Sequence, residues 1–184
     1  MASTVGVIGL GAMGSGMARS LRRHGCHVHV FDVRAEVAQA FAEGGGVACA
    51  SPAELAGPCD IIVSVVVNAA QTESVLFGEG GCASAMKRGS VFVMCSTVDP
   101  NWSIALQARL AALGILYLDA PISGGAAKAA SGEMTMMTSG TPEAYAAVGA
   151  LLDAMAGKVY RLGDAAGAGS KVKIINQLLA GVHI

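Results

Sequence analysis

The sequence predicts an α/β fold in which helices cover both faces of a doubly wound, mostly parallel sheet. Three observations predict it. Short apolar runs rich in β-branched residues recur along the chain, helix-like stretches lie between them, and a glycine-rich turn follows the first run. Strand and helix in alternation indicate parallel strands, because each helix returns the chain to the edge where the next strand begins. The 184 residues suffice for one well-buried domain, and for a second only if that one is small.

The apolar runs are the expected strands, and places where a capping side chain precedes a proline are the expected helix starts. Strands are expected at residues 4–8, 27–31, 60–65, 90–94 and 115–118. Helices should begin at Ser51-Pro52, where Glu54 stands in capping-box position, at Asp99-Pro100 and at Thr141-Pro142. In the first helix, Met13, Met17 and Leu21 recur at every fourth position and form an apolar stripe that should lie against the sheet.

The glycine-rich turn joins the first expected strand to the first helix. Its sequence is Gly9-Leu10-Gly11-Ala12-Met13-Gly14. In a dinucleotide-binding turn, Gly9 makes the tight turn, Gly11 lets the backbone approach a pyrophosphate, and Gly14 lets the helix pack close to the strand. The phosphates then lie at the helix N-terminus, where free N–H groups favour negative charge. A turn that binds nothing is the alternative in a chain with 25 glycines.

An acidic residue strengthens the nucleotide-binding interpretation. Asp32 ends the second expected strand, close to the distance of about 20 residues beyond Gly14 at which such folds carry the acid that holds the adenosine ribose. A carboxylate there accepts from the ribose hydroxyls and repels a 2′-phosphate, which favours NAD over NADP. Arg34 argues for NADP, because a guanidinium can pair with that phosphate. Strand, turn, helix and acid in this order predict a Rossmann-type fold.

Composition and charge exclude several classes of protein. Charged residues make up 14% of the chain, apolar residues 53%, and the mean hydropathy is +0.56, so we expect a further domain or a homo-oligomer to cover part of the surface. The most apolar stretch, residues 61–67, is interrupted by Ser64 and is far shorter than the ~20 residues of a membrane helix. A net charge of −1 without a Lys/Arg cluster argues against a nucleic-acid partner. No cationic segment precedes the first apolar run, so the expected location is the cytoplasm.

Neither the cysteines nor the histidines form an expected site, and no metal is expected. The cysteines are odd in number and lack the spacing of a zinc or redox pair, so we interpret them as small buried residues: Cys26, Cys49, Cys59, Cys82 and Cys95. His24, His27 and His29 are close in sequence, but no acid or cysteine stands at metal-ligand spacing from the latter two. Packing or surface roles are therefore favoured for these histidines.

Two later segments indicate a small-molecule substrate. The first, Asp119-Ala120-Pro121-Ile122-Ser123-Gly124-Gly125, follows an expected strand. Such small residues expose backbone N–H groups that can hold a carboxylate, and the Ser123 hydroxyl is a further donor. In the second, Gly167 and Gly169 precede Lys173 and Asn176, which share one helix face because they are three apart. A simple tight turn and a solvated lysine are the respective alternatives.

Four motifs together resemble the β-hydroxyacid dehydrogenases, a family that includes 3-hydroxyisobutyrate, tartronate semialdehyde, 6-phosphogluconate and threonate enzymes. The motifs, in the family's order, are residues 9–14, Ser96-Thr97, residues 119–125 and Gly167-x-Gly169-x-x-x-Lys173-x-x-Asn176. Residues 172–184 are most similar to the L-threonate dehydrogenase branch. Met94 departs from the pattern, since many members carry an acid there, and only the role of that acid is put in doubt.

The resemblance implies roles for individual residues. Lys173 would be the general acid/base and Asn176 would orient the substrate, while Lys171 lies close by but out of register. The implied substrate carboxylate site is Ser123, Gly124 and Gly125. The implied NAD contacts are Gly9, Leu10, Gly11, Ala12, Met13, Gly14, Asp32, Val66 and, at the nicotinamide end, Thr97. For Thr97, satisfying backbone groups at a strand end is the alternative.

The last helix is expected to begin near Ala168 and to be cut in mid-helix, because the sequence stops at Ile184 without a glycine cap, a basic last turn or a proline. Residues 1–165 would then form the NAD-binding domain. Residues 166–184 would begin the long interdomain helix that the resemblance implies, with an all-helical domain beyond it. A frayed native end is the alternative. The apolar face with Ile174, Leu178 and Val182 should be covered by the next domain or a second subunit.

The expected function is NAD-dependent oxidation of a small hydroxyacid, with L-threonate as the first candidate substrate. Lys173 would take the hydroxyl proton as hydride passes to the nicotinamide, which requires a closed, desolvated cleft that lowers its pKa. A 3-hydroxyisobutyrate or tartronate semialdehyde enzyme and a catalytically silent NAD-binding module remain alternatives, and the chain alone is expected to be inactive. A methyltransferase is disfavoured because it leaves Lys173 and Asn176 without a role.

Overall fold

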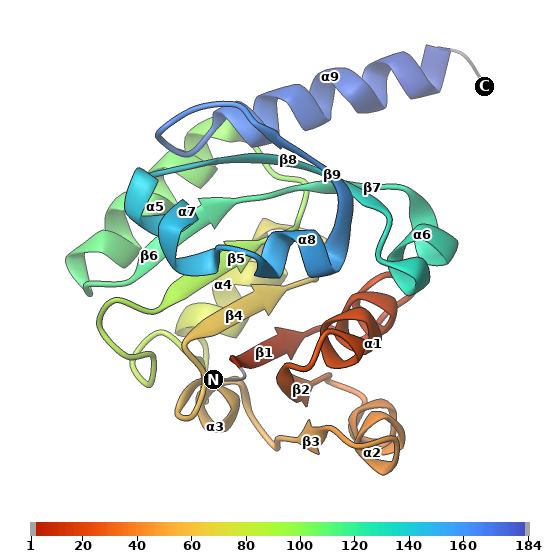
Figure 1. Cartoon of the computed structure of the whole chain (residues 1–184). Coiled ribbons are helices and arrows are strands. Elements are labelled where there is room, and N and C mark those ends of the chain that lie inside the picture. The colour runs from red at the N-terminus through yellow and green to blue at the C-terminus, as the bar shows by residue number, and fades with distance from the viewer. Residues whose placement is uncertain (1–2, 183–184) are drawn as a thin grey trace.

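A nine-stranded, mostly parallel sheet forms the centre of the molecule (Figure 1). The computed structural model describes residues 3–182. The strands are β1 (Thr4–Ile8), β2 (His27–Phe31), β3 (Val47–Ala48), β4 (Ile61–Ser64), β5 (Val91–Met94), β6 (Leu116–Asp119), β7 (Ile122–Ser123), β8 (Met134–Gly140) and β9 (Ala156–Arg161). They lie in the order β3-β2-β1-β4-β5-β6-β8-β7, with β9 paired to β8. Only the pairings of β8 with β6 and with β7 are antiparallel in this described sheet.

Helices cover both faces of the sheet. They are α1 (Gly14–Arg23), α2 (Ala35–Glu43), α3 (Pro52–Ala56), α4 (Ala69–Phe77), α5 (Pro100–Ala112), α6 (Gly125–Ser131), α7 (Pro142–Val148), α8 (Leu151–Met155) and α9 (Ala168–Val182). Successive strand residues point to opposite faces of the sheet, so Val7 and Ile8 belong to different apolar clusters. One cluster is covered by α1, α2, α6, α7 and α8, and the other by α3, α4 and α5. The predicted doubly wound α/β class is therefore confirmed.

The winding of the chain reverses at β1. From β1 the chain passes through β2 to β3 on one side, then returns to β4 beside β1 and continues through β5 to β6 on the other side. The carboxyl ends of β1 and β4 therefore border a crevice, which is where open parallel sheets bind ligands. The glycine-rich turn follows β1 and lies at this switch point.

The predicted helix starts are confirmed by their caps. Ser51, Asp99 and Thr141 each accept a hydrogen bond from a backbone N–H in the first turn of α3, α5 and α7. Glu54 reaches back as in a capping box, but it accepts from the N–H of Ala50, one residue before the cap, instead of from that of Ser51. Each of these starts also has its proline at the beginning of the helix, where a missing N–H costs no hydrogen bond.

The five predicted strands and the apolar stripe of α1 are also confirmed. The strand ends differ from those predicted by one residue at most. Met17 and Leu21 are fully buried, and Met13 packs against the same cluster. The prediction missed β3, β7, β8 and β9. The first two contain two residues each, too few to show a period, while β8 lacks Val and Ile and β9 has mostly exposed side chains.

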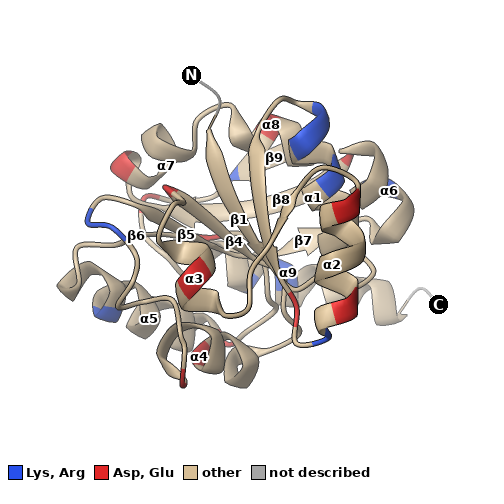
Figure 2. Cartoon of the chain, turned by 90° about the horizontal axis from the view of Figure 1, so that it is seen from below, with Lys and Arg blue, Asp and Glu red and all other residues tan. Residues whose placement is uncertain are grey.

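The described surface carries few charges. In the view of Figure 2 they are scattered over helices and loops and form no large patch of one sign. Within residues 3–182, no helix has both the length and the hydropathy to cross a membrane, and no cluster of His, Cys, Asp or Glu could hold a metal ion. Four cysteines are buried as predicted, Cys26 is half-buried, and burial raises the pKa of Cys59, Cys82 and Cys95 to about 12.

Helix α9 starts at Ala168, as predicted, and lies across one end of the sheet (Figure 1). Its first turns pack on β6, β8 and α5, whereas its second half extends away from the other elements. Of the predicted apolar face, Leu178 is 64% exposed and Val182 is 81% exposed. The described residues therefore leave this part of α9 open to solvent.

Candidate functional site

The turn between β1 and α1 has a backbone that needs glycine at two of its positions. Gly9 has φ +90, and a Cβ built on it would lie 2.6 Å from the carbonyl oxygen of Val65. A Cβ on Gly14 would overlap the carbonyl oxygen of Gly9, so only glycine lets α1 come this close to the turn. A Cβ on Gly11 would meet no atom within 4 Å. The space over Gly11 is therefore open to a ligand, as a pyrophosphate-binding turn requires.

The N-terminus of α1 offers backbone donors to an anion. Its first residue follows Met13, whose side chain makes no capping hydrogen bond, and no acid lies in the first turn. Arg22 and Arg23 lie in the last turn, near the negative end of the helix dipole. The positive end lies at the glycine turn, where no acidic side chain of α1 neutralises it. Ala12 and Met13 thus stand where backbone N–H groups can face a phosphate.

Asp32 holds this turn in place. Its Oδ2 accepts a hydrogen bond from the Leu10 N–H at 2.7 Å, and its Oδ1 accepts from the N–H and Nε of Arg34 at 3.0 and 3.2 Å. Burial acts to raise the pKa of Asp32, but the hydrogen bonds from Arg34 and Leu10 outweigh it, so the pKa lies below its ordinary value. The ionised carboxylate therefore fixes the glycine turn against β2, a role that the sequence did not reveal.

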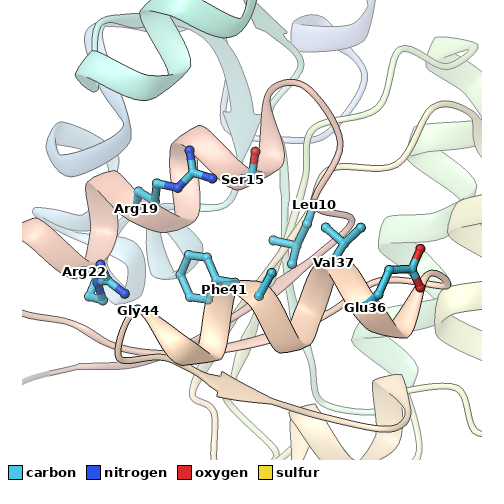
Figure 3. A pocket seen from close by; sticks show the side chains of 9 residues that line it. Leu10, Ser15, Arg19, Arg22, Glu36, Val37, Phe41 and Gly44 are labelled. Carbon is cyan, nitrogen blue, oxygen red and sulfur yellow. The ribbon is translucent and has the colours of Figure 1, made fainter.

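Leu10 separates two hollows on the surface. Its side chain is 3% exposed and points between α1 and α2, beside Val37 and Phe41, in a hollow of about 430 Å³ (Figure 3). Arg19 and Arg22 of α1 border the same hollow. Since the Leu10 N–H is directed at Asp32 and its side chain at α2, this residue supports the turn from behind.

The other hollow is a cleft of about 370 Å³ on the switch-point side of the turn. Its lining includes four of the predicted cofactor residues, Gly9, Gly11, Asp32 and Val66. Val67 and Val75 add apolar surface, and the cleft wall is much more apolar than polar, as suits an adenine ring. The fold thus brings the glycine turn, the acid of β2 and the loop after β4 into one site.

Ser96 ties the loop after β4 to the end of β5. Its Oγ donates to the Val66 carbonyl oxygen at 2.8 Å and lies 3.2 Å from the Thr72 Oγ1. The sequence singled out Ser96 only as the neighbour of Thr97. Thr97 itself is half-buried at the carboxyl end of β5, next in the sheet to β4. Ser96 is therefore a support for Val66, whereas Thr97 is not among the residues that line the cleft.

The predicted carboxylate site lies between β7 and α6. Ser123 ends β7, and Gly124 and Gly125 adopt φ of +136 and +74, which favour glycine. Gly124 precedes α6 without a capping side chain, so the N–H groups at this turn are not satisfied by a cap. A carboxylate could accept hydrogen bonds from these groups and from the Ser123 hydroxyl.

On α9, the two lysines lie in different surroundings. Lys173 is 8% exposed, and burial lowers the pKa of its ammonium group below the ordinary value. Lys171 is exposed and lines a separate hollow with Asn101 and Ile104. Asn176 is exposed one turn after Lys173. Burial of the lysine that shares a face with Asn176, and not of its neighbour, is the arrangement expected of a general base.

The glycines before Lys173 let α9 begin close to the sheet. Gly167 has φ +103, and a Cβ on Gly169 would lie 2.5 Å from the carbonyl oxygen of Met137 in β8. Ser123 pairs with Thr135, two residues earlier on β8. Two residues of a strand span about 7 Å, so β8 carries the carboxylate turn and the start of α9 side by side.

Asp119, at the end of β6, joins the same region. Its carboxylate accepts from the N–H groups of Gly167 and Ser170, both at 2.9 Å, and from the Ser170 Oγ at 2.7 Å. It lies within the segment predicted to bind substrate, but the sequence gave it no separate role. Its partners are distant in the chain, and the only available signal was an acid at a strand end followed later by Gly-x-Gly-Ser.

Comparisons with known proteins show which family the chain is similar to. Residues 4–163 match the family described as the NAD binding domain of 6-phosphogluconate dehydrogenase. The chain is 63% identical over 184 residues to an L-threonate dehydrogenase of Cupriavidus necator, covering 100% of this chain and 62% of that protein. It is 36% identical over 180 residues to mouse mitochondrial 3-hydroxyisobutyrate dehydrogenase, covering 98% of this chain and 53% of that protein.

A solved structure of a 3-hydroxyisobutyrate dehydrogenase from Salmonella typhimurium superimposes with a TM-score of 0.94 at 47% identity, over 98% of this chain and 63% of that one. A related structure at 28% identity and TM-score 0.88 was solved with NADP+. The chain spans about 60% of the length of the first of these relatives.

Proposed function

The chain belongs to the family of the NAD binding domain of 6-phosphogluconate dehydrogenase, and from that premise we propose that it serves the NAD-dependent oxidation of a small hydroxyacid. L-Threonate is the first candidate substrate, because the relative at 63% identity is an L-threonate dehydrogenase. The observation that carries the proposal is the buried Lys173, which shares a helix face with Asn176. The same domain contains the glycine turn that Asp32 holds.

The residues of the cleft fit NAD. The pyrophosphate would lie over Gly11, where the backbone is open, and at the N-terminus of α1. The adenosine would occupy the cleft lined by Val66, and its ribose would lie against Asp32. Of about four lone pairs on the carboxylate, Leu10 and Arg34 use three, which leaves one on Oδ2 for a ribose hydroxyl. Arg34 is turned toward Asp32, so a 2′-phosphate of NADP would meet the carboxylate as well as the guanidinium.

The chain's own residues supply binding and proton transfer. Ser123, Gly124 and Gly125 hold the substrate carboxylate through one hydroxyl and backbone N–H groups, and Asn176 orients the carbinol. Burial lowers the pKa of Lys173, which favours the form that can act as a base, and its Nζ accepts the hydroxyl proton as the C–H bond breaks. When bound, NAD supplies the acceptor for the hydride. The products are the oxo acid, NADH and the protonated lysine.

The experiment compares NADH formation from L-threonate by the wild type, Lys173→Ala and Lys171→Ala. Loss of a general acid/base lowers kcat by about 10²- to 10⁴-fold, so Lys173→Ala should lose activity on that scale. Lys171→Ala is the matched control, because the same change is made two residues away at an exposed position, and it should retain the wild-type rate. Equal rates for the wild type and Lys173→Ala would remove this lysine from the mechanism.

A second candidate function is NAD binding without turnover. This function needs only the glycine turn and the cleft beside Asp32, and it gives Lys173 no chemical role. Titration with NAD in the absence of substrate separates the candidates. Saturable NAD binding together with no NADH from L-threonate, 3-hydroxyisobutyrate or glycerate, the reduced form of tartronate semialdehyde, would favour the binding module.

A further inference from the structure

Asp119 is a carboxylate with no exposed surface, located where β6 ends. Its donors come from two distant segments. Ser139 of β8 donates its hydroxyl to Oδ2 at 3.2 Å, and Gly167 and Ser170 at the start of α9 donate their N–H groups to the same oxygen at 2.9 Å. The Ser170 hydroxyl donates to Oδ1 at 2.7 Å. Both carboxylate oxygens are therefore bound to α9.

This arrangement caps a helix from outside its own segment. The first turn of a helix has N–H groups without partners, and a side chain just before the helix usually accepts from them. Here the acceptor stands 48 residues before Gly167 and 51 before Ser170. Ser139 adds a second link, because its Oγ accepts from the Gly169 N–H at 2.9 Å. Three of the four backbone N–H groups of residues 167–170 are thus bound to the sheet.

The same strand end leads into the substrate segment. Asp119 is followed by four residues that end at Ser123, and Ser170 precedes Lys173 by three residues, which puts both on one face of α9. Ser170 is fully buried and Lys173 is 8% exposed, so this face is turned to the domain. Asp119 therefore connects the turn that would hold the substrate carboxylate with the helix that carries the buried lysine.

We propose that Asp119 is a positioning residue that sets the placement of Lys173 relative to the carboxylate site formed by Ser123, Gly124 and Gly125. The part that concerns catalysis rests on the proposed function. We call the hydrogen bonds from Gly167 and Ser170 to Asp119 the tether. Without it, α9 keeps its apolar contacts but loses the hydrogen bonds that fix its height and its rotation above β6 and β8. A shift of about 1 Å between a base and its proton costs about 100-fold in rate.

The test uses three variants of the protein. Asp119→Ala removes every acceptor. Asp119→Asn keeps the shape and one oxygen able to accept both N–H groups, while its amide can donate to the Ser170 hydroxyl. Ser170→Ala removes a single hydrogen bond to Oδ1. Asp60→Ala is the matched control, because Asp60 is an aspartate whose only described charge partner is the exposed Lys87.

Two readouts are measured. Amide hydrogen exchange at Gly167, Gly169 and Ser170, without substrate, reports the tether. Steady-state kinetics report kcat separately from KM for NAD. Asp119→Ala should exchange these amides faster and lose kcat by about 100-fold with KM for NAD within twofold. Ser170→Ala should lose about tenfold, since hydrogen bonds to a charged group are the stronger ones. Asp119→Asn should restore most of both readouts, and Asp60→Ala should change neither.

Several results would overturn the proposal. One is that the three amides of Asp119→Ala exchange at the wild-type rate. Another is that kcat and KM for NAD change by the same factor in that variant. A third is that kcat falls as far in Asp119→Asn as in Asp119→Ala. Should Asp119→Ala fail to fold, Ser170→Ala decides alone: faster exchange with a selective loss of kcat supports the tether, and wild-type values refute it. If the wild type shows no turnover while the amides of Ser170→Ala still exchange faster than those of the wild type, the proposed function is contradicted and the tether is supported.

Discussion

Asp32 and Asp119 both stand at the carboxyl end of β-structure and accept hydrogen bonds from the backbone of a distant segment. Asp32 binds the N–H of Leu10, 22 residues earlier, and Asp119 binds α9, 48 and 51 residues later. They differ in surroundings. Asp32 borders an open cleft, whereas Asp119 is fully enclosed. One carboxylate can therefore shape a loop and still meet a ligand, while the other can act on a ligand only through the helix that it holds.

The largest effect is expected from breaking the turn that Asp32 holds. Gly9→Ala adds a Cβ 2.6 Å from the Val65 carbonyl oxygen at a φ of +90. We expect a loss of about 3 kcal/mol in the free energy of unfolding and a loss of NAD affinity of about 100-fold or more. Gly25→Ala is the matched control, because its φ is +84 but its Cβ would meet no atom within 4 Å. It should lose only about 1 kcal/mol.

Urea unfolding and NAD titration measure both variants. Equal losses of stability in Gly9→Ala and Gly25→Ala would show that the close approach of the turn to Val65 contributes nothing.

A more selective change sharpens the comparison at the same turn. Gly11→Ala places a methyl group in open space, so the free energy of unfolding should change by less than about 0.5 kcal/mol. The same methyl group would occupy the space proposed for the pyrophosphate, and NAD affinity should fall about tenfold or more. Calorimetric titration checks this, and unaltered NAD affinity in the folded variant would move the pyrophosphate away from Gly11.

Acid should weaken the hydrogen bonds by which Asp32 holds the glycine turn. Hydrogen bonds hold the pKa of Asp32 below its ordinary value despite burial, so its contribution is fully present above the ordinary pKa of a carboxyl group and is lost as the pH falls through the lowered value. Asp32→Asn should cost about 1.5–3 kcal/mol at pH 7, and the difference from the wild type should shrink below about pH 4. Unfolding by urea across this range measures it. A difference that stays constant down to pH 2 would contradict an ionised Asp32.

At Lys173 we expect a change of stability with the opposite sign, smaller than the losses expected at Gly9 and Asp32. Burial lowers the pKa of Lys173 in the folded protein, so at neutral pH the folded state bears the cost of a buried charge that the unfolded state does not. Lys173→Met should raise the free energy of unfolding by on the order of 1 kcal/mol while it abolishes turnover. The gain should vanish above the ordinary pKa of lysine. Thermal unfolding of the wild type and Lys173→Met at pH 7 and pH 11 measures this difference. A Lys173→Met variant that is less stable than the wild type at pH 7 would show that a favourable partner holds the lysine.

The comparison also shows which parts of the structure the sequence could predict. Local signals succeeded: capping residues before Pro52, Pro100 and Pro142 placed three helices, and the glycine turn placed β1, α1 and the crevice. The acid at position 32 was found because its distance from the turn is a property of one βαβ unit. Its hydrogen bond to Leu10 was missed, since a ribose-binding role was already assigned to it.

The sequence could not predict the region around Asp119. Strand β7 has only two residues, β8 is rich in Met and Thr, and β9 has mostly exposed side chains. Their mixed directions depend on contacts across the sheet. The partners of Asp119 are fixed only when α9 folds back onto β6 and β8. Gly169 was recognised as part of a motif, and only the structure gives its reason, the close approach to the Met137 carbonyl oxygen.

Calorimetric titration of the protein with NAD and with NADP, repeated with Gly11→Ala, decides whether the glycine turn binds a dinucleotide. We expect saturable binding of NAD with a dissociation constant below about 1 mM, weaker binding of NADP, and a clear loss of NAD affinity in the variant. Absence of binding for both dinucleotides at millimolar concentration would contradict this expectation, because the turn held by Asp32 would then hold no pyrophosphate.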